Sequence, residues 1–425
     1  MKRSDIEITA PAGSWESLMA AVQAGADSVY FGAGGLNMRS KSSFNFGSGD
    51  LARIASICRE NGMKSYITLN SVIYDSEREE MERMVDAAAE SGVDGVIASD
   101  MSVIEYAFRQ GFPVHLSTQL NISNTSALKF YAKYGDVAVL ARELDLEKVK
   151  MIHEAIRREN ICGPGGKQVK IEMFVHGALC MAVSGKCYMS LHENNTSANR
   201  GSCYQTCRRS YIVTDRETGY ELEIDNEYIM SPKDLCTIGF LDRMLDAGVR
   251  VLKIEGRARS PEYVKTVTEC YDEAVKAVIG GNYSPEKIND WKKRLSTVFN
   301  RGFWDGYYLG QKAGEWHSRY GSAATRRKVY LGRITNYFTR PRVAEIKLEN
   351  GDLRSGDLLL ITGPTTGVVE YTAGEIRVDY TRTDLAPKGS YCSVKINEYL
   401  RTSDKVYKWV DEPEIIPQGS RSRNT

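Results

Sequence analysis

A repeated pattern limits the folds open to this chain. Three passages each place a glycine at the end of a helical pattern and then a short β-branched apolar run, at residues 24–32, 91–99 and 247–255. Looser copies occur at 61–70, 110–119 and 134–143. Glycine suits the position after a helix because it enters the left-handed region without a Cβ penalty. The repeat therefore predicts alternating helices and strands.

The apolar runs are nearly continuous, as expected for strands buried on both faces of a parallel sheet. We expect strands at Ile6–Pro11, Ser28–Gly32, Ser65–Asn70, Gly95–Ser99, Val114–Gln119, Val137–Ala141, Lys170–Val175 and Val251–Glu255. Eight strand-helix units predict an α/β fold with a (β/α)8 TIM-like barrel. A doubly wound open sheet is the alternative, because periodicity does not show whether a sheet closes.

The chain's 425 residues are long enough for two or three domains. We expect a barrel over 1–285 with a Cys-rich insertion at 177–236, and a basic and aromatic connector over 286–328. Short alternating runs after the connector predict a small antiparallel β-barrel over 329–411. Residues 412–425 are expected to be a disordered tail.

The net charge of +1 gives no global reason to expect nucleic acid or membrane as a partner. No apolar run approaches the roughly 18 residues of a membrane helix, and no hydrophobic segment follows the basic residues at the start. We therefore expect a cytoplasmic protein that makes no membrane contact. A reducing compartment disfavours structural disulfides.

Active sites of such barrels lie at the carboxyl ends of the strands. Polar residues expected there as substrate ligands are Arg39, Asn70, Gln119, Asn121, Arg142 and Glu143, and the candidates for catalysis are His176, Glu255 and Arg257. Glu255 and His176 are the candidates for proton transfer. Glu255 could instead form a salt bridge with Arg257 that only fixes a strand end.

Five of the nine cysteines fall within 57 residues, at Cys180, Cys187, Cys203, Cys207 and Cys236. Cys203 and Cys207 lie in a polar stretch, which argues against simple burial. Zinc sites usually show paired knuckles with short gaps, and only one short pair exists here. The spacing therefore favours an iron–sulfur cluster over zinc.

Several blocks are similar to those of the peptidase U32 family, whose members also carry the name collagenase-like. They are "ITAPAGSWESLMAAVQAGADSVYFG", "EMFVHGALCMAVSGKCYMS", "ANRGSCYQTCR", "SPKDLC" and "LKIEGRARSPEYV", and they run in order along nearly the whole chain. Arg209 departs from the pattern, because relatives often have an aromatic residue there.

The resemblance implies a 4Fe-4S cluster, with Cys180, Cys187 and Cys203 as ligands. The fourth ligand could be Cys236 or Cys207, and Cys236 is preferred because it would tie the insertion back to the barrel.

Members with a C-terminal β domain resemble the branch that hydroxylates tRNA, which implies an enzyme that forms 5-hydroxyuridine at the wobble position. Prephenate is the implied co-substrate, and Arg257 with Arg39 or Arg142 could clamp such a dicarboxylate. The implied partners are a tRNA anticodon loop and an electron donor or accessory subunit. A U32-type peptidase is the alternative function. A non-catalytic iron–sulfur accessory protein or a hydroxylase of another RNA is the second alternative.

RNA binding requires a local basic surface, since the whole chain is nearly neutral. Residues 291–330 carry nine Lys or Arg against two acidic residues, with aromatic residues interleaved. The predicted phosphate contacts are Lys292, Lys293, Arg294, Arg301, Arg326 and Arg327. Some of the aromatic residues are expected to pack between the domains instead.

Overall fold

The structure is a computed structural model that describes residues 1–41, 45–209, 211, 213–214, 216–219, 221–222, 230–311, 314–316 and 321–412. The chain divides into two compact units. The first comprises Met1–Leu295 and Asn300–Ser322, and the second comprises Ser296–Phe299 and the described residues from Ala323 onward. The predicted tail lies outside the described residues except for Glu412. No helix in the described part of the chain has the length and apolar character needed to cross a membrane.

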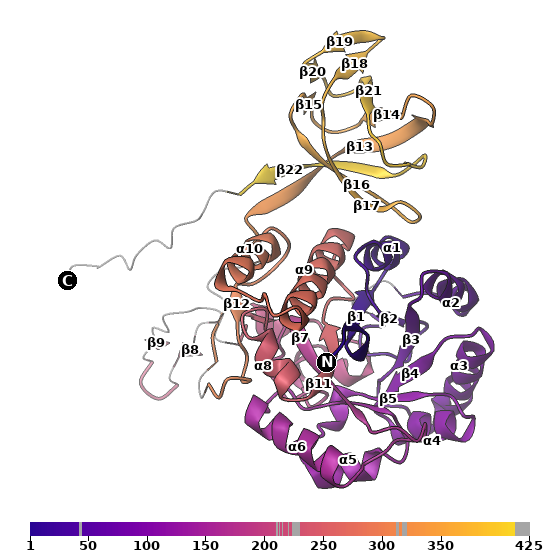
Figure 1. The fold of residues 1–425 in the computed structure, drawn as a ribbon. Coiled ribbons are helices and arrows are strands. Elements are labelled where there is room, and N and C mark those ends of the chain that lie inside the picture. Colours follow the sequence, from indigo (N-terminus) through magenta and orange to yellow (C-terminus); the bar gives the residue numbers. More distant parts are fainter. Residues whose placement is uncertain are drawn as a thin grey trace. The chain divides into compact units, whose positions relative to one another are not determined.

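Eight parallel strands form a closed barrel in the first unit (Figure 1). They are β1 (Glu7–Ala12), β2 (Ser28–Gly32), β3 (Lys64–Leu69), β4 (Gly95–Ala98), β5 (Val114–Leu116), β6 (Val137–Val139), β7 (Lys170–Gly177) and β11 (Val249–Ile254). β11 pairs with both β7 and β1, which closes the sheet. The predicted barrel is therefore confirmed, and the open sheet is wrong.

Helices surround the barrel, and each of them follows a strand in the chain (Figure 1). They are α1 (Trp15–Gln23), α2 (Leu51–Glu60), α3 (Arg78–Glu90), α4 (Met101–Arg109), α5 (Thr125–Tyr131), α6 (Leu146–Arg158), α8 (Leu241–Asp246) and α9 (Pro261–Ile279). Gly25 and Gly92, which follow α1 and α3, have φ values of 72° and 76°. These glycines adopt the left-handed conformation that the sequence pattern predicts for a helix end.

The barrel interior contains charged residues as well as the usual apolar ones. Lys253 on β11 donates to Glu172 on β7 over 2.7 Å, and both side chains are buried. His115 Nδ1 lies 3.5 Å from the second oxygen of Glu172. Burial alone would raise the pKa of Glu172, but Lys253 and His115 outweigh it and lower that pKa to about 2. The pair therefore stays charged inside the barrel.

The segment after β7 does not lead directly to the last barrel strand. It contains α7 (Met189–Asn194) and the short pair β8 (Val213–Thr214) and β9 (Glu221–Leu222). It then forms β10 (Asp234–Cys236), which pairs antiparallel with the end of β7. Further along the chain, α10 (Pro285–Ser296) precedes β12 (Phe303–Trp304), which pairs with β10. The insertion thus begins and ends at the mouth of the barrel.

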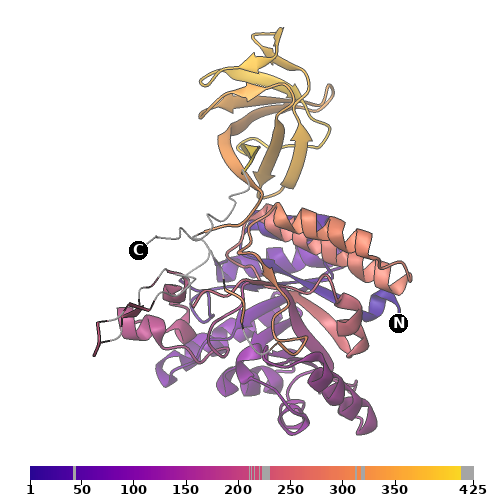
Figure 2. The same cartoon turned by 90° about the vertical axis from the view of Figure 1, so that its left-hand side faces the viewer.

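The second unit is an antiparallel β structure whose strands curve around one another (Figure 2). Its eight-stranded sheet contains β13 (Arg326–Phe338), β14 (Val343–Leu348), β16 (Leu358–Gly363), β17 (Gly367–Thr372), β18 (Ile376–Val378), β19 (Thr381–Thr383), β21 (Tyr391–Lys395) and β22 (Lys405–Asp411). The short strands β15 (Leu353–Arg354) and β20 (Leu385–Ala386) form a separate pair. Buried residues such as Leu331, Ile346 and Ile361 form the core of this unit. The predicted antiparallel class is confirmed.

Candidate active site

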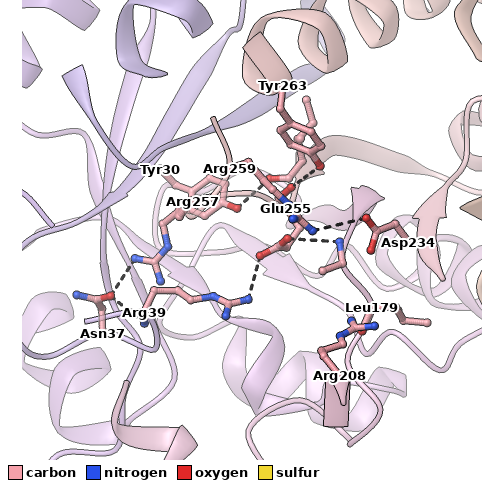
Figure 3. A network of polar contacts seen from close by, with 12 residues as sticks. Tyr30, Asn37, Arg39, Leu179, Arg208, Asp234, Glu255, Arg257, Arg259 and Tyr263 are labelled. Carbon is pink, nitrogen blue, oxygen red and sulfur yellow. Dashed lines mark hydrogen bonds and ion pairs between the residues drawn. The ribbon is translucent and has the colours of Figure 1, made fainter. Parts of the chain in front are cut away.

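An ion pair lies at the carboxyl ends of the barrel strands. Glu255 directly follows β11, and its Oε1 lies 3.1 Å from Nη2 of Arg39, which belongs to the loop after β2 (Figure 3). The backbone N–H of Ala178 donates to Oε2 of the same carboxylate over 3.3 Å. Burial would raise the pKa of Glu255, but Arg39, Arg259 and Arg142 together lower it. Glu255 is therefore an anion, and its partner is Arg39 and not Arg257.

Arg257 is buried beside this pair, with 7% of its surface exposed. Its Nη1 donates to Asn37 Oδ1 over 3.0 Å (Figure 3). The same Nη1 donates to Thr68 Oγ1 over 2.7 Å, and both acceptors are neutral. Among the residues that the structure describes, no carboxylate lies within ion-pair distance of this guanidinium. Burial lowers the pKa of Arg257 to about 10, which leaves it charged at neutral pH. A buried cation without a counter-ion is a place for an anionic ligand.

Two glycines make room for Arg257. A Cβ on Gly32 would stand 2.7 Å from Arg257 Nη1 and 3.0 Å from Asn37 Nδ2. A Cβ on Gly13 would overlap the carbonyl oxygen of Arg257. Gly13 and Gly32, at the ends of β1 and β2, must therefore lack a side chain for Arg257 to occupy this position.

Two tyrosines fix the backbone at the end of β11. Tyr30 OH donates to the carbonyl of Ile254 over 2.8 Å, and Tyr263 OH donates to the carbonyl of Glu255 over 2.8 Å. Both rings are buried. These tyrosines, together with Asn37 and Thr68, were not predicted from the sequence, because only their long-range contacts mark them.

A second buried carboxylate anchors the insertion. Asp234 on β10 lies 3.6 Å from Arg259 and 3.4 Å from Arg301. Burial raises the pKa of Asp234 even though these arginines lower it. Arg208 donates over 2.6 Å to each of two backbone carbonyls, those of Leu179 and Pro232. These contacts hold the two ends of the insertion together at the barrel mouth.

His176 does not have the surroundings of a proton-transfer group. Its side chain is buried on β7 among the rings of Tyr263, Tyr271 and Phe303, at centroid distances of 5.6 to 5.9 Å. Its Nδ1 has no hydrogen-bond partner, and burial lowers its pKa to about 3. The predicted catalytic role of His176 is therefore not supported by its position.

The polar residues predicted as substrate ligands have other contacts here. Asn70 Oδ1 accepts from the N–H of Met38 over 3.2 Å. Asn121 donates to the carbonyl of Ser184 over 3.2 Å, and Arg142 donates to that of Ala178 over 3.1 Å. Gln119 lies against Gly185 of the insertion, and Glu143 is exposed. Asn121, Arg142 and Gln119 therefore support the insertion, whereas Arg39 remains in the charged centre.

Four of the five clustered cysteines share one environment. Burial and the nearby Cys180, Cys203 and Cys187 raise the pKa of Cys207 to about 11, although Arg208 lowers it. Cys203 also acts on Arg39, which places these thiols next to the ion pair. The residues whose charges act on Cys236 are instead Lys292 and Asp305, and its thiol is buried. The preference for Cys236 over Cys207 therefore has no support in the positions of these side chains.

Most of the predicted phosphate contacts are engaged in ion pairs. Arg294 pairs with Glu273 over 2.6 Å, and Arg301 pairs with the buried Asp234. In the second unit, Arg326 pairs with Glu370 and Arg327 with Glu412, both over 2.8 Å. Lys292 and Lys293 are exposed on α10. The six predicted phosphate contacts therefore belong to different units, four of them to the first unit and Arg326 and Arg327 to the second.

A closed parallel barrel with charged side chains and cysteines gathered at its strand ends is the architecture of a TIM-barrel enzyme. The chain belongs to peptidase family U32, because the sequence model of that family matches residues 13–318. This finding confirms the resemblance that the sequence motifs indicate.

Relatives in this family have different names. The chain is 58% identical over 409 residues to a protein of Porphyromonas gingivalis named collagenase, covering 96% of this chain and 99% of the relative. It is 32% identical over 369 residues to tRNA hydroxylation protein P1 of Bacillus subtilis, covering 84% and 83%. It is 35% identical over 320 residues to the 23S rRNA 5-hydroxycytidine C2501 synthase of Escherichia coli, covering 73% of this chain and 46% of that protein.

Proposed function

We propose that this chain hydroxylates a pyrimidine base of RNA, with carbon five of the wobble uridine in a tRNA anticodon loop as the target. The observation that carries the proposal is the grouping of Cys180, Cys187, Cys203 and Cys207 beside the Arg39–Glu255 pair. Two relatives with 32% and 35% identity carry the names of RNA hydroxylation proteins.

We propose that these four thiols hold a 4Fe-4S cluster and not a single metal ion. Among the described residues, no three His, Cys, Asp or Glu side chains are grouped closely enough to hold one ion. In a cubane each thiolate binds a different iron, so its ligands stand farther apart than those around one ion. Gly185 and Gly201, with φ of 75° and 83°, turn the backbone next to Cys187 and Cys203. When bound, the cluster would supply electron transfer, and an electron donor is the partner this implies.

The cations of the site fit an anionic co-substrate. Arg257 has no carboxylate partner in the described part of the chain, and Arg39 lies close enough to lower the pKa of Arg257. Guanidinium groups bind carboxylates through paired N–H donors. A dicarboxylate such as prephenate is therefore the co-substrate that we propose. Arg142 is a weaker candidate for binding this dicarboxylate, because its guanidinium already donates to the backbone carbonyl of Ala178 in the insertion.

Glu255 is the proposed proton acceptor. Hydroxylation of carbon five breaks a C–H bond and forms a C–O bond, which is a two-electron oxidation of the base. The reaction therefore needs an oxygen-donating oxidant as co-reactant, which accepts the two electrons as it transfers its oxygen, and the hydrogen of carbon five leaves as a proton. Glu255 is ionised because three arginines lower its pKa, and a carboxylate at hydrogen-bond distance can take such a proton.

The exposed Lys292 and Lys293 are the proposed phosphate contacts.

The test is the nucleoside content of tRNA. We would express the chain in a bacterial strain that lacks 5-hydroxyuridine and measure its tRNA nucleosides by mass spectrometry. We expect the wild type and Cys236→Ala to restore 5-hydroxyuridine or its derivatives, and Cys207→Ala and Arg257→Gln not to restore them. Unchanged nucleosides with a soluble, iron-containing wild-type protein would contradict the proposal.

Peptidase activity is the second candidate, because the relative with 58% identity is named collagenase. A cysteine peptidase needs a base beside its thiol. His176 is buried among aromatic rings and its pKa is lowered to about 3, which makes it a poor base for that role. Gelatin degradation by the same purified protein, lost in Cys207→Ala, would favour this function instead.

A further inference from the structure

The Cys-rich insertion exposes an unusual number of large side chains. Within 24 residues, five apolar or aromatic side chains are more than one third exposed: Met181, Val183, Tyr188, Leu191 and Tyr204. Tyr188 is 75% and Tyr204 57% exposed. Clusters of exposed apolar side chains in a soluble protein mark binding surfaces. We call these five residues the insertion face.

The two tyrosines of this face lie close together and beside the proposed ligands. Tyr188 immediately follows Cys187 and precedes α7, and Tyr204 immediately follows Cys203. The backbone N–H of Tyr204 donates to Ser190 Oγ over 3.1 Å, which places it at the first turn of α7. Leu191, three residues after Tyr188, lies on the same side of that turn.

Several hydrogen bonds fix the insertion to the barrel loops. Arg200 Nη1 donates to Glu77 Oε2 over 2.8 Å and to the carbonyl of Val72 over 2.9 Å. The N–H of Lys41 donates to the carbonyl of Gly201 over 3.2 Å. Tyr204 therefore lies on a segment that is fixed at Arg200 and Gly201. Binding of a ligand to Tyr204 would cost little conformational entropy, because this segment is already ordered.

The part of the insertion that carries this face is basic, which favours an anionic ligand. Residues 178–209 contain Lys186, Arg200, Arg208 and Arg209 against Glu193, a net charge of +3 (four minus one), whereas residues 210–236 contain two basic and seven acidic residues. Arg200 pairs with Glu77 and Arg209 lies 3.6 Å from Glu193, so Lys186 and Arg208 supply most of the local positive charge. Cations interleaved with exposed aromatic rings are the pattern of surfaces that bind single-stranded nucleic acid. Bases stack on the rings, and basic residues attract the phosphates.

We propose that the insertion face binds unpaired nucleotides of the RNA, with Tyr188 and Tyr204 stacking on bases next to the target. This inference rests on the proposed function and adds the surface that holds the substrate loop. Stacking by both rings would keep a loop open while one base enters the barrel mouth, and a loop base is less costly to unstack than a paired one.

The test measures RNA affinity of the full chain, purified anaerobically. The probe is a fluorescent anticodon stem-loop, and a fully paired duplex of equal length is the comparison. We expect Tyr188→Ala/Tyr204→Ala to bind the stem-loop at least about tenfold more weakly, and Tyr188→Phe/Tyr204→Phe to bind as wild type, because stacking needs the ring and not the hydroxyl. Tyr380→Ala is the matched control, because Tyr380 is 96% exposed in the second unit.

The outcomes separate this inference from the proposed function. Equal stem-loop affinity of the wild type and the double alanine variant would overturn the insertion face and leave RNA hydroxylation standing, and it would assign the face to a protein partner. A wild type that binds no RNA would overturn both. Photo-crosslinking of the stem-loop to the wild type does not depend on how the variants fold. Crosslinks at Tyr188 or Tyr204 are expected, and crosslinks only elsewhere would also overturn the inference.

Discussion

Arg39 and Glu255 form an ion pair of 3.1 Å although 216 residues separate them in the chain. The pair connects the loop after β2 with the end of β11. Burial lowers the pKa of Arg39, but Glu255 and the neighbouring Cys203 outweigh it and raise that pKa. Arg39 therefore lies between the carboxylate of Glu255 and the thiol of Cys203, and its charge interacts with both groups.

The substitution Glu255→Gln should destabilise the protein. The side-chain amide would keep an acceptor for the N–H of Ala178 but would leave Arg39 partly buried without its counter-charge. We expect the free energy of unfolding to fall by about 3 kcal/mol, measured by urea denaturation. The double variant Arg39→Gln/Glu255→Gln should recover part of that loss, because it removes the charge left alone.

The control for this pair is an exposed one. Arg377 and Glu375 lie 2.6 Å apart with both side chains largely in solvent, so Glu375→Gln should leave the free energy of unfolding unchanged. A Glu255→Gln variant as stable as wild type would mean that the Arg39–Glu255 ion pair makes no net contribution to the free energy of unfolding.

Gly32→Ala should remove activity while the fold persists. The new methyl group would meet Arg257 Nη1 at 2.7 Å and also Asn45, so the guanidinium must move away from Asn37. The matched control is Gly35→Ala, where nothing lies within 4 Å of the added Cβ. We expect 5-hydroxyuridine in tRNA to fall at least about tenfold for Gly32→Ala and to be unchanged for Gly35→Ala. Equal activity of the two variants would exclude a need for this position of Arg257.

The barrel could be predicted from the sequence because its signals are local. Each glycine such as Gly92 ends a helix, and the apolar run after it supplies a strand, so the predicted and observed strand ends differ by at most three residues. Closure does not follow from the periodicity, which also allowed an open sheet, and it is the pairing of β11 with β1 that shows it. The antiparallel class of the second unit follows from equally local alternation.

The contacts within the site could not be predicted, because they join residues far apart in the chain. Arg257 is predicted as a site residue, but its partners Asn37 and Thr68 lie in other strand–helix units. The two fourth-ligand candidates show the same limit. The sequence places Cys207 in a polar stretch and Cys236 between Leu235 and Thr237, but only the structure shows that Cys236 is buried on β10 beside β7, with Lys292 and Asp305 as the charges that act on it.

Cys207→Ala should prevent cluster binding, whereas Cys236→Ala should not. Cys207 shares the environment of Cys180, Cys187 and Cys203, and Cys236 does not. After anaerobic purification we expect iron, sulfide and visible absorption to be strongly reduced in Cys207→Ala and near wild-type levels in Cys236→Ala. The opposite result would restore Cys236 as the fourth ligand, and equal loss in both would indicate that the substitutions unfold the insertion.

His176 should make the protein less stable in acid. Its pKa in the folded state is about 3, below the ordinary value of 6.5 for a free side chain, because burial among aromatic rings disfavours its charged form. Below about pH 6.5 the unfolded chain binds a proton at this residue that the folded chain does not bind. His176 should therefore lower the free energy of unfolding by about 1.4 kcal/mol for each pH unit between about 6.5 and 3.

The variant His176→Phe isolates this effect, because phenylalanine fits among Tyr263, Tyr271 and Phe303 and Nδ1 has no hydrogen bond to lose. Urea denaturation of both proteins from pH 8 to pH 4 provides the measurement. Above about pH 7 the difference between them should be constant, since histidine is then neutral in both states. Below about pH 6.5 the variant should become progressively more stable than wild type. A difference that stays constant down to pH 4 would mean that His176 accepts a proton in the folded protein, and it would return this residue to the candidates for proton transfer.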